Sequence, residues 1–132
     1  IKAIAQAVIM AGKVYAFGSA RAGTGKAPED AKRGDHWVCL DAETGKQLQA
    51  EPCMEAGSVI AADGMIYFLE GGEHHKKTPK LSLVRPTEKG FEKVSSFDLP
   101  ATNCEVWANP SIHEGRLFYR CGGMLAVYDL RQ

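Results

Sequence analysis

The sequence lacks several features that would assign a protein to a class directly. Its 16 Lys and Arg residues balance 16 Asp and Glu residues, so the formal net charge is zero. Nucleic acids and anionic membrane surfaces usually bind basic proteins or basic patches, so this balance favours neither partner. No apolar stretch approaches the roughly 18 residues of a membrane-spanning helix, and no signal-type segment is present. Because the chain begins at Ile1 instead of Met, we expect it to be processed or cut from a longer protein.

The cysteines also lack a diagnostic arrangement. Cys39, Cys53, Cys104 and Cys121 are neither adjacent nor spaced as C-x-x-C. An even number permits disulfides but does not require them. Cys39 and Cys121 lie in short apolar runs, which favours buried, unreactive thiols.

Long helices are not expected, because no segment keeps apolar residues at helical spacing for three turns. Short apolar runs rich in β-branched and aromatic residues alternate instead with Gly, Asp, Asn and Pro, which is typical of strands and turns. The predicted strands are Ala7–Met10, Val14–Phe17, Trp37–Asp41, Gln47–Ala50, Ser58–Ala61, Met65–Leu69, Leu81–Arg85, Phe91–Phe97, Asn109–His113, Arg116–Tyr119 and Leu125–Leu130.

One pattern occurs three times, at an interval of about 50 residues. Each copy has an apolar strand, a two-residue turn that ends in glycine, and a strand with an aromatic residue three positions after that glycine. The copies are "VIMAGKVYAFG" (8–18), "VIAADGMIYFLEG" (59–71) and "SIHEGRLFYRCG" (111–122). Their turn glycines are Gly12, Gly64 and Gly115, and we expect a positive φ at each.

Each copy continues into a third strand, and the first copy then turns through "LDAETGK" (40–46) into a fourth. Asp41 can accept hydrogen bonds from turn amides, and Gly45 can supply a positive φ. The repeat therefore predicts an all-β fold of four-stranded antiparallel meanders, each a β-propeller blade. We expect one partial domain over residues 1–132, with blades at about 5–52, 53–103 and 104–132, the third lacking its outer strand.

About three blades make an incomplete ring, because closed propellers have roughly four to eight. We therefore expect the remaining blades of a longer chain, or other copies of this chain, as partners. In the first case a distant N-terminal segment supplies the outer strand of the third blade.

"GKVYAF" (12–17) followed by "LDAETGK" (40–46) resembles the pyrroloquinoline-quinone-like β-propeller repeat. Quinoprotein dehydrogenases use this repeat, and so do non-catalytic relatives that include an outer-membrane assembly lipoprotein. The resemblance covers nearly the whole chain in three copies. The second copy has "LVRPTEKG" in place of the second motif, and the third keeps only "YD". The family's tryptophan after the "TGK" turn, which docks adjacent blades, is replaced by Gln47, Leu48 and Gln49.

The resemblance implies a non-catalytic protein more than an enzyme. The family's catalytic members need a bound quinone, a calcium ion, a catalytic aspartate and often a disulfide between neighbouring cysteines, and this sequence has no adjacent cysteine pair and no carboxylate cluster at those positions. We predict a scaffold or binding module without a cofactor that engages a protein or small ligand through its loops and channel mouth. The resemblance also implies a bacterial, extracytoplasmic location, periplasmic or secreted.

Two other functions stay open. The first is part of a quinone-dependent dehydrogenase, with pyrroloquinoline quinone and calcium bound mainly outside this segment. The second is a self-assembling structural module.

Three residues are candidates for ligand binding, because chain entering the innermost strand of a propeller lies near the central channel. They are Glu105, Trp107 and Asn109. In the alternative interpretation Trp107 packs between blades and its neighbours belong to a local turn. We predict no catalytic residue and interpret Asp41, Asp63 and Asp129 as turn or strand-end residues.

Two segments resemble functional motifs, a phosphate-binding loop and a metal site, but we interpret both as loops. "GSARAGTGKAPED" (18–30) fails the phosphate-loop pattern G-x-x-x-x-G-K-[ST], because Ala20 and Ala27 stand at its first and last positions when it is aligned on Gly25 and Lys26. "GGEHHKK" (71–77) has neighbouring histidines that point apart in extended chain, so no metal site is predicted there.

Overall fold

The computed structural model describes residues 6–19, 35–71, 78–100, 106 and 108–131, and within them the chain is all-β, with no helix. The strands are β1 (Val8–Met10), β2 (Lys13–Ser19), β3 (Asp35–Asp41), β4 (Gln47–Pro52), β5 (Ser58–Ala62), β6 (Met65–Glu70), β7 (Lys80–Thr87), β8 (Gly90–Asp98), β9 (Ser111–His113), β10 (Arg116–Cys121) and β11 (Met124–Asp129). Each of the predicted strands is confirmed, although Asn109 precedes β9 instead of opening it.

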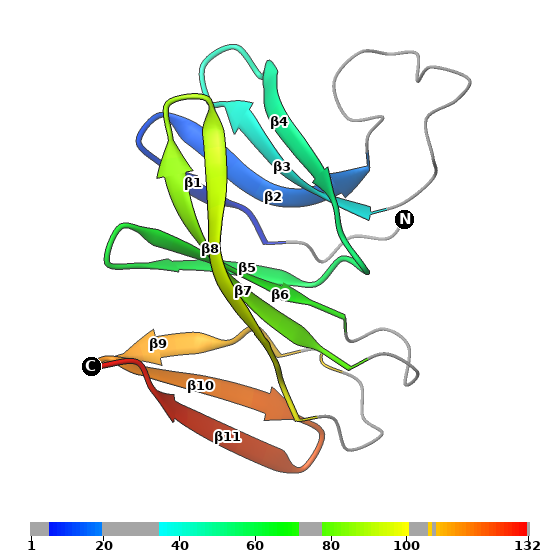
Figure 1. The fold of residues 1–132 in the computed structure, drawn as a ribbon, viewed down its shortest axis with the longest axis vertical. Helices are drawn as coiled ribbons and strands as arrows, with labels where there is room; N and C mark the ends of the chain where they lie inside the picture. The colour runs from blue at the N-terminus through cyan, green and yellow to red at the C-terminus, as the bar shows by residue number, and fades with distance from the viewer. Residues whose placement is uncertain (1–5, 20–34, 72–77, 101–105, 107, 132) are drawn as a thin grey trace.

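The strands form three antiparallel meanders, which we call sheet 1 (β1–β4), sheet 2 (β5–β8) and sheet 3 (β9–β11). Sheets 1 and 2 have four strands, and sheet 3 has three, in the order predicted from the repeat. The sheets are stacked with sheet 2 in the middle and do not close on themselves (Figure 1). The antiparallel meanders are thus confirmed, whereas their arrangement as propeller blades stays a prediction.

The three repeated hairpins have the same backbone conformation. Gly12, Gly64 and Gly115 have φ of 71°, 74° and 72°, as predicted. The residue before each glycine also has a positive φ, between 48° and 51°. Two successive positive φ angles define a type I′ turn, whose twist matches that of the paired strands. The repeat in the sequence is therefore a repeat of local backbone geometry.

A core rich in aromatic residues joins sheets 1 and 2. Trp37 of β3 stacks on Phe68 of β6 with a centroid separation of 4.8 Å and an interplanar angle of 8°. Phe17 meets Phe68 edge to face at 5.3 Å, and Phe91 of β8 lies 6.2 Å from both Trp37 and Phe68. Offset stacking and edge contacts are the favourable geometries of aromatic pairs.

Sheet 2 is buried on both faces. Ile66 and Phe68 of β6 point into the core shared with sheet 1, whereas Leu69 and Leu81 belong to a second core shared with Leu117 of sheet 3. Side chains alternate between the two faces of a strand, so a strand covered on both sides must be apolar at consecutive positions. This is why β6 reads "MIYFLE" without alternation.

Gln49 of β4, which follows the "TGK" turn, connects sheets 1 and 2. Its side-chain oxygen accepts a hydrogen bond from the backbone N–H of Phe91 at 2.8 Å, and Leu48 packs against the aromatic core. The neighbouring Gly90 has a φ of 148°, and a β-carbon there would lie only 2.7 Å from the Cβ of Gln49. Docking of these two sheets therefore uses an amide hydrogen bond and a close backbone approach.

The cysteines differ in state. Cys39 is a thiol in the core, and burial raises its pKa, as expected for an unreactive residue. Cys121 is disulfide-bonded, so the prediction of an unreactive thiol is wrong at that position. An apolar strand supplies burial for a disulfide as readily as for a thiol, and local sequence does not distinguish the two.

Candidate functional site

The two ends of the sheets are different surfaces. The turns between β1 and β2, β3 and β4, β5 and β6, and β7 and β8 all lie at one end, which we call the turn end. The segment that leads from β4 to β5 lies at the other end, which we call the loop end (Figure 1). Asn109, the candidate ligand-binding residue that the structure describes, lies at the loop end.

Asn109 is the one candidate ligand-binding residue among the described part of the chain. It is exposed, and its side-chain oxygen accepts a hydrogen bond of 2.6 Å from the hydroxyl of Ser58, which is the first residue of β5. The bond joins the segment before sheet 3 to the start of sheet 2. Glu105 and Trp107 lie outside the described residues.

Next to this contact, two carboxylates fix the segment between β4 and β5. Glu70, at the end of β6, accepts the backbone N–H of Met54 at 2.9 Å. Asp35, at the start of β3, accepts the backbone N–H of Ala56 at 2.8 Å. A carboxylate that accepts backbone N–H groups satisfies donors that would otherwise be lost on burial.

We call the residues Asp35, Glu55, Ser58, Glu70 and Asn109 the loop-end cluster. Glu55 and Glu70 are buried, with 5% and 6% of their surface exposed, which is rare for acidic residues. Two of its carboxylates already bind backbone amides, so their first role is to shape the loop end. The exposed Asn109 is the member placed to meet a ligand from solvent.

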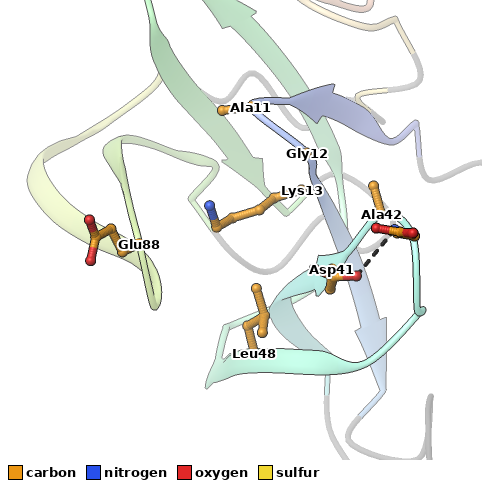
Figure 2. Close-up of a pocket in the computed structure, with 8 residues that line it drawn as sticks. Ala11, Gly12, Lys13, Asp41, Ala42, Leu48 and Glu88 are labelled. Atoms are coloured by element: carbon orange, nitrogen blue, oxygen red, sulfur yellow. Dashed lines mark hydrogen bonds between the residues drawn. The ribbon is translucent and has the colours of Figure 1, made fainter.

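A pocket of about 610 Å³ lies at the turn end (Figure 2). Its walls come from the β1–β2 turn, the β3–β4 turn and the β7–β8 turn, and Figure 2 shows Lys13 and Glu88 on facing walls. Asp41, Glu43 and Glu88 make it acidic, and Leu48 is its one large apolar side chain. Binding pockets are predominantly apolar with a few polar groups, so this open, charged hollow is a weak candidate.

The carboxylate of Asp41 accepts hydrogen bonds from residues of the β3–β4 turn. One of its carboxylate oxygens accepts the backbone N–H of Thr44 at 2.7 Å, the Thr44 hydroxyl at 2.7 Å and the backbone N–H of Glu43 at 3.2 Å. These bonds, the Thr44 hydroxyl first, lower the pKa of Asp41. Gly45 follows with a φ of 70°, so the predicted turn roles of Asp41 and Gly45 are confirmed.

The other two aspartates also have the predicted positions. Asp129 ends β11 and accepts bonds from Arg131, whose side chain lowers the pKa of that carboxyl. Asp63 lies in the β5–β6 turn with a φ of 51°.

The turn-end pocket lacks the lining expected for the quinone that the alternative requires. A planar quinone needs an apolar or aromatic wall, and no aromatic side chain lines the pocket in Figure 2. Calcium needs six to eight oxygen ligands. No group of three or more His, Cys, Asp or Glu side chains among the described residues could hold a metal ion. Most of the "GSARAGTGKAPED" and "GGEHHKK" stretches falls outside the described residues.

Sequence reasoning missed four members of the loop-end cluster and the inter-sheet role of Gln49. The four are Asp35, Glu55, Ser58 and Glu70. Glu70 carried one usable signal, because it directly ends a run of apolar residues that must be buried. An acidic residue there requires a hydrogen-bonding partner. The identity of that partner, Met54, depends on how β5 and β6 follow β4, which local sequence does not encode.

No family model matches this chain, and no curated protein matches it. In the described part of the chain there is no helix long and apolar enough to cross a membrane.

Proposed function

We propose that this chain is a non-catalytic scaffold or binding module built from β-propeller blades of the pyrroloquinoline-quinone-like type. It engages a protein or a small ligand at its loop end. The remaining part of the ring comes from a longer chain or from other copies. The location that goes with this proposal is extracytoplasmic and bacterial.

The observation that carries the proposal is the contact between Ser58 and Asn109. It joins two successive sheets at the point where the chain enters β5 and approaches β9. If the sheets are blades, β1, β5 and β9 are their inner strands, and this contact borders the central channel. An exposed amide beside a hydroxyl provides two donors and two acceptors at its mouth.

The described part of the loop end also has internal hydrogen bonds that support a binding surface. Two buried or half-buried carboxylates, Glu70 and Asp35, hold the β4–β5 segment through backbone N–H groups. A rigid binding surface loses less conformational entropy when a ligand binds, so less of the binding free energy is spent on ordering it. The turn-end pocket offers mainly exposed charges, which bind weakly in water.

The proposal is tested by mapping a library of small polar fragments onto the ¹⁵N-labelled chain by NMR. We expect amide shifts to concentrate at Ser58, Val106 and Asn109, and we expect Asn109→Ala to weaken that binding at least fivefold. Glu88→Gln, at the turn end, is the matched control and leaves it unchanged. Shifts that gather around Gly12 and Ala42 instead, or no saturable shift at the loop end, contradict the proposal.

The enzyme alternative has its own test. The purified full-length protein is supplied with pyrroloquinoline quinone and calcium, and quinone absorbance and dye-linked alcohol oxidation are measured. We expect neither bound quinone nor oxidation. Retention of the quinone through gel filtration together with dye reduction would favour the dehydrogenase.

A further inference from the structure

The β5–β6 turn lacks a hydrogen bond that the other two repeated turns make. The backbone N–H of Ala42 donates to the carbonyl of Gly12 at 2.9 Å, which ties the β1–β2 turn to the end of β3. Leu130 donates in the same way to Gly115 at 2.7 Å and ties the β9–β10 turn to the end of β11. No described residue donates such a backbone bond to Gly64 in the β5–β6 turn.

Pro86 of β7 explains the missing bond. The second residue after the turn glycine pairs with Leu40 in sheet 1 and with Val84 in sheet 2. Ala42 and Pro86 lie two residues beyond these partners, so they occupy equivalent positions. Proline has no N–H to donate. Pairing of β6 with β7 also begins only at Ile66, whereas β2 pairs with β3 from the first residue after its glycine. Within the described residues, the β5–β6 turn is therefore held only by its own hairpin.

Asp63 opens this turn, and its carboxylate has no hydrogen-bond or ionic partner among the described residues. Every other described aspartate has such a partner; these are Asp35, Asp41, Asp98 and Asp129. The charge of Asp63 acts on Tyr67, whose pKa is raised by burial first and by that charge second, so the Tyr67 hydroxyl stays neutral. Asp63 and the following Gly64 are both exposed. The Asp63 side chain is thus free to turn towards the backbone of Gly64.

An aspartate that precedes glycine can form a cyclic succinimide. The backbone nitrogen of Gly64 bonds to the carboxyl carbon of Asp63, and the amide proton leaves with the carboxyl hydroxyl as water. Water then adds to the main-chain carbonyl carbon of the ring and breaks its bond to nitrogen, which leaves isoaspartate. No electrons are exchanged in either step. Glycine has no side chain to hinder the approach, and a β-carbon at Gly64 would meet no atom within 4 Å.

Ring closure requires the turn to open, because a type I′ turn fixes the backbone angles of its first residue. The free energy of local opening is lowest where few hydrogen bonds hold a segment. Among the three repeated turns, the one with an aspartate before its glycine is also the one without a bond to the third strand. The reactive pair and the weakly held turn therefore coincide.

We propose that Asp63 is a site of spontaneous isomerisation to isoaspartate, made reactive by a turn that lacks the hydrogen bond of the other two repeated turns. Isoaspartate lengthens the main chain by one carbon between Ala62 and Met65, the pair that closes the β5–β6 hairpin. A two-residue turn cannot keep its geometry with that extra atom, so the product loses pairing at the start of β6. This inference goes beyond the proposed function, because the β5–β6 turn is a separate surface from the loop-end cluster.

The test incubates the folded 132-residue chain at neutral pH and physiological temperature and maps its peptides by mass spectrometry at successive times. Electron-transfer fragmentation distinguishes isoaspartate from aspartate, and the succinimide is lighter by one water. We expect isoaspartate at Asp63 to form about ten times faster than at Asp41 or Asp98, because neither of these precedes glycine.

Two variants separate the chemistry from the turn. Asp63→Glu is the matched control, because Glu114 occupies the same turn position in sheet 3 with a φ of 48°. Glutamate would have to close a larger ring, which forms far more slowly, so we expect no isomerised product. Pro86→Ala restores the N–H donor, and we expect it to slow isomerisation at Asp63 about fivefold, the factor for one typical net hydrogen bond.

If Pro86→Ala does not fold, amide hydrogen exchange of the unchanged chain makes the same comparison. Met65, Lys13 and Arg116 each follow a turn glycine, and we expect exchange to be fastest at Met65. Isoaspartate that forms only in the urea-unfolded chain, or equally at Asp41, overturns the proposal. An unchanged rate in the folded Pro86→Ala variant, or equal exchange at the three amides, also overturns it, because the missing bond would then not select this turn.

Discussion

The repeated hairpins allow one prediction with a matched control inside the chain. Gly64 and Gly123 both lie in two-residue hairpin turns, and a β-carbon at either would meet no atom within 4 Å. They differ in backbone conformation, because Gly64 has a φ of 74° and Gly123 is not among the positive-φ glycines. Alanine at the two positions therefore isolates the effect of φ from any steric contact.

For Gly64→Ala we expect a loss of about 1–2 kcal/mol in the free energy of unfolding, because an L-residue in the left-handed region costs that much. The corresponding fall in melting temperature is about 3–10 °C for a domain of this size. For Gly123→Ala we expect a change between about zero and 1 kcal/mol of stabilisation, since alanine restricts the unfolded chain. Urea denaturation gives both free energies, provided the m-values of the variants match.

The reasoning is refuted if Gly64→Ala is neutral, or if Gly123→Ala destabilises by as much. A further check adds Ala11→Asn in the first hairpin, where the φ of Ala11 is 49°. Asparagine tolerates this region better than alanine, so that variant should gain a few tenths of a kcal/mol.

Three other predictions follow from contacts between distant segments. Gly90→Ala should destabilise the fold by about 1–3 kcal/mol, because the new methyl group meets Gln49. In a double-mutant cycle, adding Gln49→Ala should recover part of that loss, and strictly additive free energies would contradict the contact. Glu70→Ala should cost about 1–3 kcal/mol by leaving the N–H of Met54 without an acceptor, while Glu70→Gln, which keeps an oxygen, should cost less; equal losses in urea titrations would contradict this role. The folded state lowers the pKa of Asp41 below its ordinary value of 3.8. The Asp41 carboxylate therefore contributes to the free energy of unfolding above that pH, and this contribution is lost as the pH falls further. Asp41→Asn should reduce the dependence of stability on pH in the acid range, and an unchanged slope would refute the assignment.

The sequence was sufficient for the strands and turns of this protein because their determinants are local. Short apolar runs between turn residues located each strand, and the glycines of the three copies located the type I′ hairpins. The Thr44 and Gly45 turn was equally predictable, since Asp41 satisfies amides only two and three residues away.

The features that sequence did not reveal depend on contacts between residues far apart in the chain. Gln49 and Phe91 are 42 residues apart, and Glu70 and Met54 are 16 apart. The sequence around one residue of such a pair does not identify its partner, because polar residues at strand ends are also common at the surface. The disulfide at Cys121 was missed because burial in a strand leaves the oxidation state of a cysteine undetermined.

Among the described residues, sheet 2 is covered on both faces, whereas sheets 1 and 3 each pack on sheet 2 alone. Removal of sheet 3 would uncover Leu69 and Leu81, but removal of sheet 2 would deprive both other sheets of their support. Opening should therefore begin at the ends of the stack and reach the middle last, as in a linear array with nearest-neighbour coupling. Proteases would then cut first within sheet 1 or sheet 3, and the resistance of the described sheets to digestion would be set by how often an end sheet detaches.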